Sequence, residues 1–257
     1  MRRLEGAHDR GEMRAGYRQF CAIARTLDLV GQRWTLLVVR ELLLRGPLPA
    51  AAIARGLPDV PMNQLVERLA LLESRELVRR RGSDDGRGDD GRIRARGYEY
   101  ELTEAGRELG DVLEALAGFG LSRLAGAGRE PGDAVLPHVL MRQLELRYDR
   151  AAAGAAGFSA RFELALTDPE QLWSVEPAAD APGRFALVAR PDGLQARAGA
   201  CLDADAVLTC SVEVCTRLVA GDPAARAEIE VAGAEDAAAT LLDLLGAPAP
   251  AGTAVAA

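Results

Sequence analysis

Between residues 17 and 124, the apolar residues change their spacing in an order that few folds can accommodate. The first stretch places apolar residues three and four positions apart, which is the spacing of one helical face. These residues are Ile23, Leu27, Val30 and Trp34. Gly31 interrupts the pattern, and a second apolar helix, ended by a Gly-Pro pair, is expected at 35–46. A short AAAIARGL helix comes next, and two prolines bracket the turn after it.

The next predicted helix, at 61–74, has an apolar face and a polar remainder. We assign Leu65, Val66, Leu69 and Leu72 to the apolar face, and Asn63, Gln64, Glu67 and Arg68 to the other faces. Two strand-like stretches then flank a loop rich in Gly, Asp and Arg at 82–97, which predicts a hairpin. Thr103 suits the N-cap of a last helix. Its apolar stripe is Leu109, Val112, Leu113 and Leu116.

The order helix, helix, helix, hairpin, helix is that of a winged helix-turn-helix. The segment resembles the HxlR-type winged-helix regulators of transcription over about 110 residues. The resemblance is carried by Cys21, LDLVGQRWTLLVVREL at 27–42, ERLALLESRELVRR at 67–80 and YELTEAGREL at 100–109. The chain departs from the family at LPAAAIA (48–54) and at Pro61, where a Ser or Thr is usual. We therefore expect phosphate anchoring there to be weaker or to come from other residues.

The resemblance implies that helix 61–74 enters the major groove of double-stranded DNA. Asn63 and Gln64 would pair with adenine, and Arg68 with guanine. In the hairpin, the candidate phosphate contacts are Arg79, Arg80 and Arg81 on one strand and Arg92, Arg94 and Arg96 on the other, with Arg87 near the tip. Four aspartates also lie at the tip. The alternatives are a solvated helix face and a loop that neutralises its own charge.

A small winged helix cannot bury both its first and its last apolar helix, so one of them is expected to pair across a two-fold axis in a homodimer. Cys21 stands where the resembled family often has a cysteine, and the resemblance implies a redox sensor in some relatives. Its apolar neighbours Ile23 and Leu27 instead favour a buried, inert thiol.

The second half alternates strand-like runs with helical patterns, which predicts an α+β domain with a mostly antiparallel sheet. The strands are expected at 162–166, 184–190, 194–199, 205–210 and 227–233, and the helices at 212–221 and 235–246. The pattern is similar to sterol-carrier-protein-like domains, and this resemblance implies an apolar ligand tunnel. The expected lining is Phe162, Leu164, Leu166, Trp173, Phe185, Leu187, Leu208, Leu241 and Leu245. The alternative is that these residues form a packed core.

With 257 residues, the chain is long enough for two domains. We expect a flexible arm at 1–15, a winged helix at 16–125, a second domain at 134–246 and a disordered tail at 247–257. Residues up to 125 hold 21 arginines and 19 acidic residues, a balance of +2. The remainder holds 10 arginines and 19 acidic residues, a balance of −9. DNA contact would therefore depend on arginines gathered on one face.

Composition argues against catalysis. The two histidines are His8 and His138, and the four scattered cysteines lack the spacing of a zinc site or redox motif. We expect no enzyme activity, metal or cofactor. No run of eighteen apolar residues occurs, so a cytoplasmic protein without a membrane partner is expected.

Together these patterns favour a dimeric DNA-binding transcriptional regulator, with an apolar small-molecule effector in the second domain. The alternative is a carrier of hydrophobic ligands or an interaction protein whose winged helix serves only for dimerisation.

Overall fold

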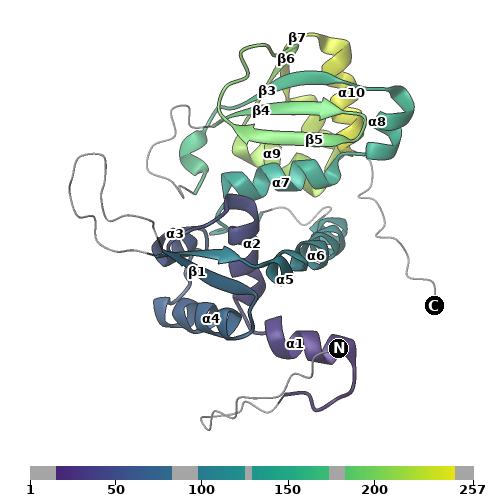
Figure 1. The fold of residues 1–257 in the computed structure, drawn as a ribbon. Coiled ribbons are helices and arrows are strands. Elements are labelled where there is room, and N and C mark those ends of the chain that lie inside the picture. The colour runs from purple at the N-terminus through teal and green to yellow at the C-terminus, as the bar shows by residue number, and fades with distance from the viewer. Residues whose placement is uncertain (1–15, 83–97, 125–128, 174–182, 247–257) are drawn as a thin grey trace.

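A computed structural model describes residues 16–82, 98–124, 129–173 and 183–246, and shows two lobes stacked end to end (Figure 1). Each lobe has its own cluster of buried apolar side chains. The first cluster is centred on residues such as Val38, Ile53 and Leu69, and the second on residues such as Phe162 and Leu241. The expected arm at 1–15 and tail at 247–257 lie outside the described residues.

The first lobe follows the predicted order of elements. It contains α1 (Ala22–Val30), α2 (Thr35–Arg45), α3 (Ala50–Arg55), α4 (Met62–Ser74), β1 (Val78–Gly82), β2 (Tyr98–Leu102), α5 (Glu104–Arg107) and α6 (Leu109–Leu124). The apolar faces of α2, α3 and α4 meet in the first cluster, so the three helices form one packed unit against the hairpin. Leu65, Leu69 and Leu72 of α4 are fully buried there.

The hairpin is held by its register and by the chain on both sides of it. β1 pairs antiparallel with β2, with Val78 opposite Leu102, and Leu48 forms an additional bridge with Tyr100. Thr103 caps a helix as predicted, because its hydroxyl accepts a hydrogen bond from the Gly106 amide at 3.1 Å. This helix is the short α5, however, and the predicted apolar stripe lies on the separate helix α6. A Cβ at position 106 would collide with the carbonyl oxygen of Leu77, so only glycine fits this close approach.

The second lobe is a five-stranded sheet with helices. It contains α7 (Pro137–Arg147), α8 (Arg150–Ala156), β3 (Ala160–Leu166), the 3₁₀ turn η1 (Pro169–Gln171), β4 (Arg184–Arg190), β5 (Gly193–Ala198), β6 (Ala206–Cys210), α9 (Val212–Ala220), the 3₁₀ turn η2 (Pro223–Glu228), β7 (Glu230–Gly233) and α10 (Glu235–Gly246). The strand order is β5-β4-β3-β6-β7. The sheet is mixed, because β3 and β6 run parallel and the other neighbouring strands are antiparallel.

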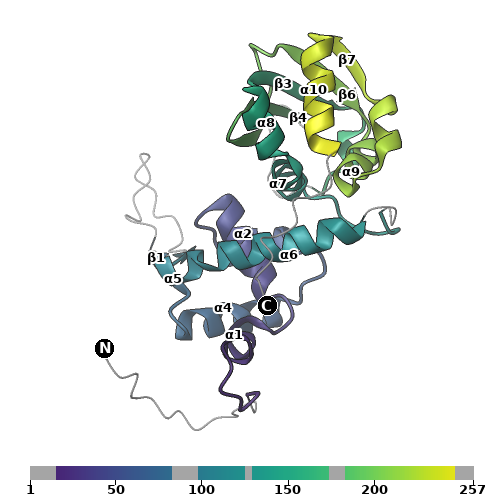
Figure 2. The same ribbon diagram turned by 90° about the vertical axis from the view of Figure 1, so that its right-hand side faces the viewer.

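Helix α7 joins the two lobes, and the sequence patterns did not predict it. It lies beneath the sheet, on the side that faces α2 and α6 (Figure 2). His138 contacts Glu41 of α2, Arg142 pairs with Glu114 of α6, and Glu145 accepts a hydrogen bond from the Ala196 amide of β5 at 2.9 Å. One helix thus binds both the winged helix and the sheet. None of the helices in the described ranges is long and apolar enough to span a membrane.

Candidate nucleic-acid interface

The first two turns of α4 present an exposed face to solvent. Asn63 is exposed and Gln64 is partly buried, while Val66 and Glu67 are exposed one turn further on. Pro61 precedes the helix in an extended conformation and makes no side-chain cap. The first amide groups of a helix have no partner within the helix, so this end carries partial positive charge. Asn63 and Gln64 therefore lie where an approaching nucleic acid would meet both side chains and free amides.

Arg68 does not share this exposed face. Only 8% of its surface is exposed, and its Nη2 lies 3.1 Å from Oε2 of Glu67. The reason is its place in the helix, since it lies three residues after Leu65 and four before Leu72 and so falls on the apolar face. Val66, assigned to that face from the sequence, is instead 53% exposed. The helical spacing of three and four residues from Leu65 and Leu72 places position 68 on the buried face and position 66 outside it. The prediction followed residue type instead, since Arg68 is charged and Val66 is apolar.

The arginines of β1 lie on both faces of the hairpin. Arg79 and Arg81 lie on one face with Glu101, and Nε of Arg79 is 2.6 Å from the Glu101 carboxylate. Arg80 lies on the other face, over the ring of Tyr98 at 4.7 Å and 3.0 Å from the carboxylate of Glu73. All three side chains remain largely exposed. Phosphate contact at this hairpin would therefore compete with ion pairs that already exist.

The other hairpin arginines, Arg92, Arg94, Arg96 and Arg87, lie outside the described residues.

A buried carboxylate fixes α3, the helix before the turn, against α2. Glu41 of α2 is completely buried and accepts hydrogen bonds from Arg40 at 2.8 Å and from Arg45 at 3.2 Å. The same two guanidinium groups also donate to backbone oxygens of this segment, Arg40 to Gly56 and Arg45 to Ala52. We call Arg40, Glu41, Arg45 and His138 the Glu41 cluster. Because the cluster holds the end of α3, it also sets where the turn and α4 begin.

The Glu41 cluster extends into the second lobe. Nε2 of His138 lies 3.1 Å from both carboxylate oxygens of Glu41. Burial alone would raise the pKa of Glu41, but the hydrogen bonds and charge of His138 and Arg40 outweigh it and hold that pKa below its ordinary value. A second contact joins the lobes nearby, where Nε1 of Trp173 donates to the Arg55 carbonyl at 2.8 Å. The second lobe thus contacts α2 and α3, the two helices immediately before α4.

Comparisons with known proteins agree with this geometry. The family described as HxlR-like helix-turn-helix matches residues 29–126. An uncharacterized HTH-type transcriptional regulator of Synechocystis is 32% identical over 100 residues, which are 39% of this chain and 67% of that protein. The chain belongs to the HxlR-like helix-turn-helix family.

Other relatives match a similar share of the chain. An uncharacterized HTH-type transcriptional regulator of Mycobacterium tuberculosis is 37% identical over 101 residues. The match covers 38% of this chain and spans 56% of that relative. Among solved structures, the reduced form of the transcriptional regulator YodB from B. subtilis shares 28% identity, with a TM-score of 0.32. That match covers 45% of this chain and all of YodB.

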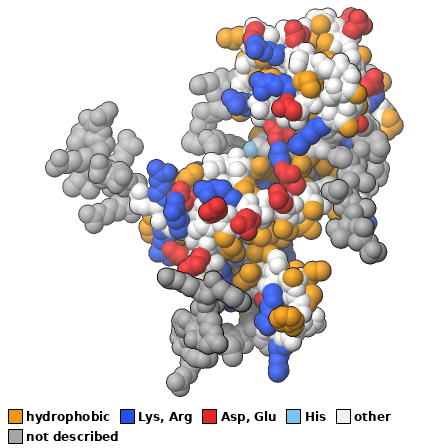
Figure 3. Space-filling model, turned by 45° about the vertical axis from the view of Figure 1, so that its right-hand side comes forward, with side chains coloured by type: hydrophobic (Ala, Val, Ile, Leu, Met, Phe, Trp, Pro, Cys, Tyr) orange, Lys and Arg blue, Asp and Glu red, His pale blue; other side chains and the backbone are white. Residues whose placement is uncertain are grey.

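The HxlR-like domain leaves a large apolar surface uncovered. On α6, Leu109 is buried and Leu113 is partly buried, whereas Val112, Leu116 and Phe119 are exposed. On and before α1, the exposed apolar residues are Tyr17, Phe20, Ile23 and Leu27. Figure 3 shows hydrophobic side chains gathered on the face of the HxlR-like domain where α6 and α1 lie. We call these exposed residues of α1 and α6 the apolar face.

The cysteines differ from expectation at one position. Cys21 is exposed, contrary to the burial expected from its neighbours, because Ile23 and Leu27 project from α1 rather than into the lobe. Cys210 and Cys215 are buried in the second lobe, where a mutual hydrogen bond and burial raise the pKa of Cys215. Cys21, in contrast, is exposed at the N-terminus of α1.

The residues expected to line a ligand tunnel lie mainly in the second core. Phe162, Leu164, Leu166, Phe185, Leu187, Leu208, Leu241 and Leu245 are all buried members of one cluster. Trp173 is 43% exposed and faces the HxlR-like domain through its hydrogen bond to Arg55. The structure has a cavity elsewhere, between α6, α7 and α9, and none of these residues lines it. Alternating apolar residues mark a buried strand equally well in a core and in a tunnel wall, so the pattern could not separate the two.

Proposed function

We propose that the chain is a transcriptional regulator that binds double-stranded DNA as a homodimer through its HxlR-like domain. The observation that carries this proposal is the N-terminal face of α4, which presents Asn63 and Gln64 beside free helix amides. In a winged helix this end of the second helix reaches base edges in the major groove. The family membership of residues 29–126 supports the same function.

The proposed contacts divide into two kinds. Asn63 and Gln64 read bases, because each amide can bond bidentately to adenine. Arg79 and Arg81 contact phosphates beside the groove. Arg92, Arg94 and Arg96, which lie outside the described residues, are proposed as further phosphate contacts. Arg80 is held against Tyr98 and Glu73, so it positions the hairpin on α4. Arg68 supports α4 from its buried side and does not read a base.

The apolar face supports the dimer. Val112, Leu116 and Phe119 follow one another at intervals of four and three, so they form one stripe along α6. Exposed apolar surface of this extent on a small lobe is typical of a protein interface. A two-fold axis through it would bury the stripe against its own copy and place two α4 helices for two half-sites.

The second lobe is proposed to regulate the HxlR-like domain rather than to catalyse a reaction. Support comes from its contacts with α2 and α3 through His138 and Trp173. The proposal also includes a similarity of the second lobe to sterol-carrier-like domains. It further includes domain boundaries at 16–125 and 134–246 and a cytoplasmic location. The carrier alternative has no comparable support, because its expected tunnel residues form a packed core.

A selection experiment tests the proposal. The full chain is incubated with a library of random DNA duplexes, and the bound fraction is amplified and sequenced. We expect an inverted repeat whose half-site centres lie about 10 base pairs apart, and an affinity that falls steeply with salt. Enrichment of no sequence, or of a site without two-fold symmetry, would contradict a dimeric regulator.

A further inference from the structure

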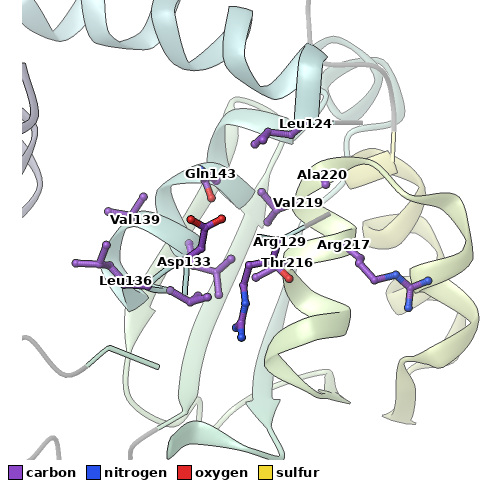
Figure 4. A pocket seen from close by; sticks show the side chains of 13 residues that line it. Leu124, Arg129, Asp133, Leu136, Val139, Gln143, Thr216, Arg217, Val219 and Ala220 are labelled. Atoms are coloured by element: carbon purple, nitrogen blue, oxygen red, sulfur yellow. The ribbon is translucent and has the colours of Figure 1, made fainter. Parts of the chain in front are cut away.

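A cavity of about 230 Å³ opens where the two lobes meet. One face of α7 forms a wall, through positions 136, 139, 140 and 143 at helical spacing. The opposite side is formed by α9 and by the end of α6 (Figure 4). The apolar lining residues are Leu124, Ala134, Val135, Leu136, Val139, Leu140, Val219 and Ala220. The walls are thus apolar and come from both lobes.

The polar groups of the cavity differ in whether they already have partners. Arg217 pairs with Asp222 and Glu228, and Thr216 donates to the Glu213 carbonyl. The Asp133 carboxylate accepts a hydrogen bond from the Glu130 amide at 3.0 Å. Within the described part of the chain, the side chains of Arg129 and Gln143 make no hydrogen bond or ion pair. One cation and one amide are therefore available to an occupant.

We propose that this cavity is an effector site for a small carboxylate with an aromatic or branched acyl body. Its volume corresponds to roughly eight water molecules, which limits the occupant to about one ring. The apolar walls would hold that body, while Arg129 at the rim pairs with the carboxylate. A cationic ligand would be repelled by Arg129, and an uncharged one would leave Arg129 unpaired. Asp133, on the same rim, already accepts a hydrogen bond from the Glu130 amide.

The cavity is connected to the DNA-binding elements through α7. His138 precedes Val139 of the cavity wall and bonds to Glu41. Arg142 precedes Gln143 and pairs with Glu114 of α6. An occupant that shifts α7 therefore acts on the Glu41 cluster, which holds α3, and on α6, which carries the apolar face. This coupling rests on the proposed function, whereas binding at the cavity does not.

Binding is tested with 4-fluorobenzoate and the full chain, observed by fluorine NMR, with 4-fluorobenzyl alcohol as the uncharged probe. We expect saturable binding of the carboxylate, at least fivefold weaker binding of the alcohol, and a similar loss for Arg129→Gln. Val139→Phe, which fills the cavity, should abolish binding. Arg197→Gln is the matched control, because Arg197 is an exposed arginine of β5 that does not line the cavity.

Several results would overturn the site. These are no binding at millimolar probe, equal binding of the two probes, or unchanged binding in Arg129→Gln. Arg129 is exposed, so its variant decides the question even if Val139→Phe fails to fold.

Coupling is tested by measuring DNA affinity with and without saturating 4-fluorobenzoate. We expect a change of about tenfold in the wild type, which equals about 1.4 kcal/mol of coupling. His138→Gln should retain the probe and lose most of the response. Binding of the probe without any change in DNA affinity would overturn the coupling. A chain that binds the probe but no DNA would instead contradict the proposed function and leave the site supported.

Discussion

The two lobes differ in how completely they bury their own apolar side chains. In the described part of the second lobe, the large exposed apolar residues are Trp173 and Leu202. In the HxlR-like domain they include Ile23 and Leu27 of α1, a stripe of α6, and Met62 and Val66 of α4. The second lobe therefore completes its own core, whereas the first presents surfaces that need partners. This contrast supports the proposals that the first lobe contacts a second copy and DNA, and that the second lobe regulates it.

The largest effect is expected from charge on the apolar face. The double variant Leu116→Glu, Phe119→Glu should convert the dimer to a monomer, because four carboxylates would face each other across the two-fold axis. DNA affinity should fall more than a hundredfold, since each half-site alone supplies only part of the contacts. Light scattering coupled to size exclusion, with DNA titration, measures both.

The second lobe offers a matched control. Leu202 is fully exposed there, so Leu202→Glu should change neither the oligomeric state nor the DNA affinity. If the α6 variant remains a dimer, or if Leu202→Glu also dissociates the protein, the contrast between the lobes does not hold.

The next largest effect, on the free energy of unfolding, is expected at the Glu41 cluster. Glu41→Ala should lower the free energy of unfolding by about 3 kcal/mol, because it leaves the guanidinium of Arg45 buried without its carboxylate. Glu228→Ala, at an exposed carboxylate whose partner Arg217 also pairs with Asp222, should cost less than about 1 kcal/mol. Urea denaturation measures the pair, and equal losses would show that the cluster is not a special support of α3.

The same carboxylate predicts a dependence on pH. The pKa of Glu41 is lowered in the folded protein from an ordinary value of 4.5. Its stabilisation is therefore complete above that value and is lost as the pH falls through the folded pKa. Glu41→Gln should flatten the acid limb of the stability curve below about pH 4.5. An unchanged acid limb would contradict the role of this ion cluster.

The smallest effect is expected at the hairpin. Arg79→Gln and Arg81→Gln should each change stability by less than about 1 kcal/mol, because both guanidinium groups are exposed and each variant leaves Glu101 the other arginine. Each should also reduce the slope of log affinity against log salt by about one. Binding titrations at several salt concentrations measure the slope. An unchanged slope would place these two arginines off the DNA.

The sequence predicted the HxlR-like domain almost element by element, because its helices and turns are marked by local signals. Thr103 and the Gly-Pro pair after α2 are such signals. It also predicted the strands and the last two helices of the second lobe. It did not predict α7, although Leu136, Leu140 and Leu144 recur at helical spacing after a loop.

The site was predicted less completely than the fold. Asn63 lies on the exposed face of α4 as expected. Arg68 is buried and Val66 is exposed, the reverse of the prediction, because position in the helix outweighs residue type. The junction could not be predicted, since Glu41 and His138 are 97 residues apart and nothing local pairs them. A cavity formed by three separate helices leaves no local pattern either.

The most direct test of the account measures the specificity of Asn63→Ala and Arg68→Ala on the selected DNA site and on a scrambled duplex. We expect Asn63→Ala to lose about 1 to 3 kcal/mol on the selected site and little on the scrambled one, because a base contact is removed. Arg68→Ala should lower stability and leave the ratio of the two affinities nearly unchanged. If Asn63→Ala leaves that ratio intact while Arg68→Ala strongly reduces it, α4 does not present Asn63 and Gln64 to DNA.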